Sequence, residues 1–158
     1  MNIATKKGFG FGLTSGIITT IGVMVGLAEG TGLKIAVVGG ILTVAVADAF
    51  SDAFGMHISE ETNKMKKYPS IWKTSLATFF TKLIVALSFL VPILFFKLSL
   101  GVLLGIIWAT ILLIIFNFQL AVSRKENPYK FVAIHIVMTA VVVLTSYLIG
   151  KFVSAYFS

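Results

Sequence analysis

Two aspartates stand one helical turn apart in a stretch that is otherwise apolar. Residues 35–57 carry no charge before Asp48, and Asp52 follows four residues later. At this spacing both carboxylates project from one face of a helix, and Met56 continues that face on the next turn. Carboxylates suit Mg²⁺, Ca²⁺ and Mn²⁺, whereas a thioether favours softer first-row metals. The stretch therefore predicts a cation site and does not choose the ion.

Carboxylates inside a membrane helix are costly unless something compensates their charge. The lowest scales give ~2.5–3.5 kcal/mol for one aspartate at the centre of a span. Protonation, water, a bound cation or an ion pair would offset that cost. Lys82 is the available partner, as a counter-ion or in proton coupling, so a structural salt bridge with Asp48 or Asp52 is the competing interpretation. For Met56 the competing role is to fill a gap in the core.

The composition indicates which elements must position these side chains. Of the 158 residues, 58% are hydrophobic and 12% are charged, whereas soluble domains keep about a quarter of their residues charged. We therefore predict an all-α, multi-pass integral membrane protein with a single membrane domain over residues 1–158. It would lie in the cell membrane if the source is prokaryotic. Five segments are long and apolar enough to span a bilayer, at 9–28, 35–57, 75–96, 98–121 and 131–154. Pro128 is placed to begin the last helix.

The first segment resembles a signal peptide in one respect, because two lysines precede an apolar run. Its glycines at 8, 12 and 16, and again at 22 and 26, are spaced by four residues. Small residues at that spacing let helices approach closely. The spacing favours a retained helix that packs against its neighbours.

Basic residues set the expected orientation. With the N-terminus in the cytoplasm and the C-terminus outside, nine of them fall in cytoplasmic segments and three in outer segments, as the positive-inside rule requires. The nine are Lys6, Lys7, Lys64, Lys66, Lys67, Lys73, Arg124, Lys125 and Lys130, and the three are Lys34, Lys97 and Lys151. Because the net charge of +7 is dispersed between apolar segments, it indicates contacts with lipid headgroups rather than with nucleic acid.

The strongly polar residues of the spans are expected on the cytoplasmic side. At 1.5 Å per residue, Asp48 lies ~13 Å from the cytoplasmic end of its helix, and Ser15 lies ~10 Å from the start of the first. The loop at 57–73 opens with His57, Glu60 and Glu61. We interpret His57 as interfacial and the glutamates as a solvated face. All three could draw cations to the mouth of a path or take part in proton coupling.

Sequence signatures of enzymes are missing. The chain has no cysteine, which excludes disulfides, a thiolate nucleophile and a thiolate metal site. It also has no GxSxG, HExxH, Walker or dinucleotide-binding motif. We expect no enzymatic activity and no resident cofactor.

Four phrases of the chain resemble the vacuolar iron transporter family. GLTSGIITTIGVMVGLAEG (12–30) is similar to that family's first helix, with its GLNDGLVSTLG-like phrase, and SDAFGMHIS (51–59) to its second-helix phrase of the type SMAAGEYVS. FLVPILFF (89–96) resembles the proline-centred end of its third helix, and YLIGKFV (147–153) its last-helix ending. The phrases occur in the family's order, with the same five spans and N-terminus inside.

The resemblance implies a homodimer that moves Fe²⁺, and often Mn²⁺, out of the cytoplasm in exchange for protons, along a path lined by the first and second helices. Three positions depart from the family pattern. Ser15 stands at the first-helix aspartate, Asp52 at the second-helix methionine, and Met56 at the second-helix glutamate. The loop between spans two and three is also too short for the family's glutamate-rich metal-gathering domain.

We therefore expect a proton-coupled exporter of divalent transition metals. Asp48, Asp52, Met56 and the Ser15 hydroxyl would form the metal site, and ligands that must be ionised to coordinate would couple metal to proton movement. Two alternatives stay open. One is a non-transporting scaffold or assembly partner with a structural Asp–Lys pair, and the other is a channel for protons or monovalent cations.

Overall fold

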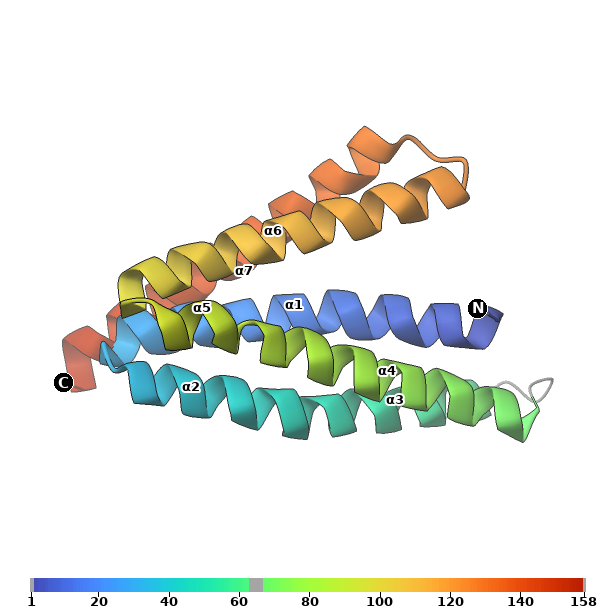
Figure 1. Ribbon diagram of the computed structural model, residues 1–158, viewed down its shortest axis with the longest axis horizontal. Coiled ribbons are helices and arrows are strands. Elements are labelled where there is room, and N and C mark those ends of the chain that lie inside the picture. Colours follow the sequence, from blue (N-terminus) through green and yellow to red (C-terminus); the bar gives the residue numbers. More distant parts are fainter. Residues whose placement is uncertain (1, 63–66, 158) are drawn as a thin grey trace. The chain divides into compact units, whose positions relative to one another are not determined.

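The computed structural model describes residues 2–62 and 67–157, and every regular element within them is helical (Figure 1). The elements are α1 (Ile3–Thr31), α2 (Lys34–Thr43), the π-helical segment η1 (Val44–Asp48), α3 (Ala49–Glu61), α4 (Tyr68–Ser88), α5 (Leu90–Phe95), α6 (Leu98–Ser123) and α7 (Pro128–Phe157).

Five of the described helical stretches are long and apolar enough to cross a membrane. They are Ile3–Thr31, Lys34–Glu61, Tyr68–Phe95, Leu98–Ser123 and Pro128–Phe157. The predicted helices are therefore confirmed in number and order, and α7 begins at Pro128 as expected. Each helix is longer than its predicted span, because helical hydrogen bonding continues into polar residues that an apolar window excludes. Lys64 and Lys66, which contribute to the predicted orientation, lie outside the described residues.

Two of these stretches contain a break in regular α-helix. In Lys34–Glu61 the five residues of η1 form a wide π turn between α2 and α3. In Tyr68–Phe95 the helix is interrupted at Phe89, between α4 and α5. Pro92 explains the second break, because proline has no N–H to donate to the carbonyl of Ser88 four residues earlier.

The chain divides into two compact units. Unit one comprises Met1–Thr20 and Ile41–Ser88, and unit two comprises Ile21–Gly40 and Phe89–Ser158. The continuous helix α1 contributes its first part to unit one and its last part to unit two.

In unit one, α1 packs closely on α4 through glycines. A Cβ atom added to Gly8 would lie 2.2 Å from the carbonyl oxygen of Thr74, and one added to Gly12 would lie 2.6 Å from that of Thr78. Such distances leave no room for a side chain. Gly8 and Gly12, four residues apart on α1, thus face Thr74 and Thr78, four residues apart on α4. The predicted packing role of this row is confirmed.

Unit two uses the second glycine row in the same way, against α7. A Cβ atom on Gly22 would lie 3.2 Å from the hydroxyl of Ser146, and one on Gly26 would lie 3.5 Å from the carbonyl oxygen of that residue. From the other side, a Cβ atom on Gly150 would come within 2.5 Å of the Gly26 carbonyl oxygen. Both predicted glycine rows therefore mark helix contacts.

Candidate functional site

The centre of the polar cluster in unit one is the ammonium group of Lys82. Its side chain, on α4, is fully buried at 0% exposure. The Nζ atom lies 2.5 Å from Oδ2 of Asp48 and 2.5 Å from Oδ2 of Asp52. The two carboxylates, which the sequence places on one helical stripe, therefore converge on a single cation carried by a neighbouring helix. This is the ion pair that the competing interpretation predicts.

Ser15 of α1 completes the cluster. Its hydroxyl donates to Oδ2 of Asp52 at 2.6 Å and accepts from the Lys82 ammonium at 2.9 Å. The close approach of α1 makes this possible, since a Cβ atom on Gly16 would lie 3.3 Å from Cγ of Lys82. An ammonium has three donor hydrogens, and here it has three oxygen partners. Two of these contacts, with Ser15 and Asp52, are hydrogen bonds. The contact with Asp48 is an ion pair by distance, and within the described residues Asp48 Oδ2 is buried without a hydrogen-bond partner.

The carboxylates keep capacity for a further ligand. Their side chains are 30% exposed for Asp48 and 20% exposed for Asp52, in contrast to the enclosed lysine. Within residues 2–62 and 67–157, their ion pairs and hydrogen bonds all use the Oδ2 atoms, which leaves both Oδ1 atoms unused. Two carboxylates and one ammonium also sum to a formal charge of −1. The cluster therefore retains both the oxygen ligands and the negative charge that a cation requires.

The wide turn η1 ends at the first of these carboxylates. It covers Val44–Asp48, and α3 resumes regular geometry at Ala49. Single π turns inside α-helices occur frequently at functional sites. In this chain the turn marks where the polar stripe of α3 begins.

That stripe continues along α3 at four-residue intervals. Met56 is 8% exposed and Glu60 is 2% exposed, whereas Phe54 and Ile58 on other faces are 62% and 63% exposed. The stripe therefore faces the packed interior of unit one. Met56 lies one turn beyond Asp52, next to the cluster and not among the groups that bind Lys82.

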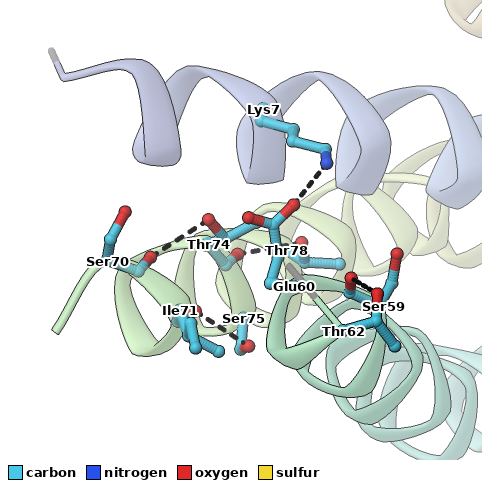
Figure 2. Close-up of polar contacts among 9 residues, drawn as sticks. All are labelled: Lys7, Ser59, Glu60, Thr62, Ser70, Ile71, Thr74, Ser75 and Thr78. Carbon is cyan, nitrogen blue, oxygen red and sulfur yellow. Dashed lines mark hydrogen bonds and ion pairs between the residues drawn. The ribbon is translucent and has the colours of Figure 1, made fainter. Parts of the chain in front are cut away.

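Glu60 ends the stripe in a second ion pair, with Lys7 of α1 (Figure 2). The Glu60 side chain is 1% exposed and that of Lys7 is 51% exposed. Figure 2 shows the carboxylate directed towards Lys7 beside Thr74 of α4. The prediction of a solvated face is therefore wrong for Glu60. Glu61, on the next position, is exposed as expected.

His57 joins α3 to α4 at the same end of the helices. Its Nδ1 lies 3.2 Å from the hydroxyl of Ser75, and its Nε2 lies 3.5 Å from a carboxylate oxygen of Glu61. The ring also packs against Trp72, with 4.6 Å between the ring centroids. His57 is therefore held between polar and aromatic partners.

The predicted metal ligands are brought together only in part. Ser15, Asp48 and Asp52 meet, and the point between them is occupied by the Lys82 ammonium. Among the described residues, no three histidine, aspartate or glutamate side chains gather closely enough to hold a metal ion by themselves. A metal at this site would need other ligands, such as the Ser15 hydroxyl, the Met56 thioether, water or a second copy of the chain.

Sequence reasoning missed two features of this region, the Lys7–Glu60 pair and the wide turn η1. The first had an available signal, because Glu60 lies two turns beyond Asp52 on the same stripe. Sequence reasoning offered Lys82 as a partner of Asp48 or Asp52, and the structure pairs it with both.

In comparisons with known proteins, no family model matches the chain, and no match was found among curated proteins.

Proposed function

We propose that this chain is a multi-pass membrane transporter that moves a divalent transition metal, Fe²⁺ or Mn²⁺, out of the cytoplasm in exchange for protons. One observation carries the proposal. The carboxylates of Asp48 and Asp52 converge on one buried positive group, the Lys82 ammonium, whose Nζ lies 2.5 Å from an oxygen of each. Ionisable groups inside membrane helices usually mark ion pathways.

The orientation follows from the distribution of basic residues. Nine lysines and arginines in one set of connecting segments against three in the other favour a cytoplasmic N-terminus. In that orientation the Asp48–Asp52–Lys82 cluster lies in the cytoplasmic half of the membrane, and the Lys7–Glu60 pair lies nearer the cytoplasmic surface.

Charge balance suggests how protons would be coupled. With Lys82 in place the cluster carries −1, and adding a divalent cation would bring it to +1. If the cation displaces the ammonium and Lys82 releases one proton, the cluster becomes neutral instead. A neutral cluster is far less costly in a low-dielectric interior than a charged one. Metal binding would thus release a proton from Lys82, and reprotonation would return the lysine to the aspartates and expel the metal.

The choice of ion rests on ligand chemistry and on the resemblance to the vacuolar iron transporter family. Carboxylate oxygens suit Mg²⁺ and Mn²⁺, and a thioether such as that of Met56 favours softer metals. The combination therefore suits Mn²⁺ and Fe²⁺ better than it suits Mg²⁺. The partial exposure of Asp48 and Asp52 supports a homodimer, in which twofold symmetry would bring a second pair of carboxylates to the same ion.

A second candidate is a non-transporting scaffold in which the cluster is structural. The burial of Lys82 in ion pairs with both aspartates and in a hydrogen bond with Ser15 favours this alternative. If no metal ion competes with Lys82 for the carboxylates of Asp48 and Asp52, the lysine would only hold α1, α3 and α4 together.

Transport into proteoliposomes separates the two. Purified protein is reconstituted, and Mn²⁺ or Fe²⁺ uptake is followed with an enclosed metal-sensitive dye and a pH dye. We expect metal uptake with opposite proton movement in the wild type, and loss of both in Asp48→Asn and Asp52→Asn. Glu126→Gln, which changes an exposed carboxylate paired with Arg124, is the matched control and should transport normally. Folded protein that moves no metal under any gradient would establish the scaffold. Conductance without metal dependence would indicate a channel.

A further inference from the structure

Unit two contains a large cavity that the proposed transport function does not use. Its volume is about 810 Å³, and its walls come from α1, α6 and α7. All of the lining residues belong to unit two. Pockets of about 300–1,000 Å³ are typical of sites for small organic molecules. The cavity is therefore large enough for such a ligand.

The polar and apolar parts of this cavity are separated along its length. Glu29 near the end of α1, Ser99 at the start of α6 and Tyr147 on α7 contribute polar groups. From Ser99 the α6 wall continues to Leu113, which is ~21 Å along a helix. That wall is otherwise apolar, because the hydroxyl of Thr110 donates to its own helix, to the Ile106 carbonyl oxygen at 2.8 Å.

Glu29 is the single charged residue among those that line the cavity. Across the described parts of the chain, no lysine, arginine or histidine forms an ion pair with it. Helix α7 approaches α1 closely at this point, since a Cβ atom added to Gly150 would lie 2.9 Å from Cβ of Glu29. Glu29 is partly exposed. A ligand that covers this carboxylate without pairing it would bury an unpaired charge, which is costly, so the site favours a cationic ligand.

We propose that the cavity binds an amphiphilic organic cation, with one ammonium or phosphonium centre near Glu29 and an apolar body along α6 and α7. A metal ion does not fit this chemistry, because one carboxylate among apolar walls provides too few oxygen ligands. A neutral apolar molecule would leave Glu29 uncompensated. A zwitterionic phospholipid would bring its phosphate close to the same carboxylate. The proposal is independent of metal transport at Lys82.

Equilibrium binding of tetraphenylphosphonium tests the proposal, with the protein in phosphatidylglycerol nanodiscs and empty nanodiscs subtracted. That lipid carries no amine that would compete. We expect saturable binding of tetraphenylphosphonium and none of tetraphenylborate, an anion of the same shape. Glu29→Gln should weaken cation binding by about tenfold or more, because it removes a charge a few ångströms from the ligand. Glu29→Asp should retain most of it, and Ala140→Phe, which fills the cavity from α7, should abolish it.

Size-exclusion profiles and melting temperatures establish that the variants are folded, and Glu126→Gln is the charge-matched control. Equal binding of the cation and the anion by the wild type would overturn the proposal without any variant. So would unchanged cation binding in folded Glu29→Gln. Loss of binding in Asp52→Asn with full binding in Glu29→Gln would place the cation in unit one and also refute the assignment.

Discussion

Lys82 and Asp52 are joined twice, once directly between Nζ and Oδ2 at 2.5 Å and once through the hydroxyl of Ser15, which hydrogen-bonds to both. Because the lysine side chain is fully buried, neither partner can exchange the other for water without rearrangement. The polar groups on α1, α3 and α4 are therefore coupled, and substitutions among them should not act independently.

Lys82→Met should destabilise unit one strongly. The change leaves two carboxylates facing an apolar side chain, and removing one partner of a buried ion pair costs about 3–5 kcal/mol. Thermal unfolding in detergent would show a lower melting temperature. Combining Lys82→Met with Asp52→Asn should recover part of the loss, because fewer unpaired charges remain. Lys73→Met, at an exposed lysine of the same helix, is the control and should change little. Simple additivity of the two substitutions would contradict the coupling.

Substitutions of Ser15 should test its two roles, the hydrogen bonds within the cluster and the position of a possible metal ligand. Alanine removes the hydroxyl that bridges Asp52 and Lys82, which should cost about 1 kcal/mol of stability. Aspartate places a third carboxylate beside Asp48 and Asp52, and this should strengthen Mn²⁺ binding measured by calorimetry. Weaker Mn²⁺ binding in a folded Ser15→Asp protein would show that the cluster is not a metal site.

Gly12→Ala should separate α1 from α4. The added Cβ atom would lie 2.6 Å from the carbonyl oxygen of Thr78, and overpacking of this kind costs about 1–3 kcal/mol. Gly55→Ala is the matched control, because a Cβ atom there meets nothing within 4 Å. A lower melting temperature is expected for Gly12→Ala alone. Equal stability of the two variants would mean that the glycine row does not determine the helix contact.

Lys7→Met should lower stability more than its exposure suggests. Lys7 is 51% exposed, but its partner Glu60 is 1% exposed, so the substitution removes one half of an ion pair that reaches into the interior of unit one. Glu60→Gln in the same chain should restore most of the lost melting temperature. For comparison, Arg124 and Glu126 form an exposed pair, and such pairs contribute about 0–1 kcal/mol. If Lys7→Met proved as mild as Arg124→Met, the Glu60 pair would have no special role.

The apolar helices and their packing faces were predictable from the sequence. Length and hydropathy identify the five helices, Pro128 identifies the start of α7, and the glycine spacing identifies the α1 faces that contact α4 and α7. These features are local, so each depends on residues close together in the chain. The shared stripe of Asp48 and Asp52 was predictable for the same reason.

The partners of the charged residues were harder to predict, because they depend on how separate helices meet. Lys7 and Glu60 are 53 positions apart, and their contact requires the exact level at which α1 passes α3. Whether the two aspartates form an open metal site or pair with Lys82 likewise depends on contacts between helices. It depends on the reach of the Lys82 side chain and on the close approach of α4 to α1 at Gly16. No pattern within one helix contains that information.

The five-residue turn at Val44–Asp48 also affects how this chain can be aligned with others. A π turn accommodates more residues than a regular turn of α-helix, so α2 and α3 follow different angular frames. An ungapped comparison with a regular helix would misplace every face on one side of the turn by about 100°, the rotation of one residue. Positions before Val44 and after Asp48 should therefore be matched to a regular helix separately, with a one-residue gap between them.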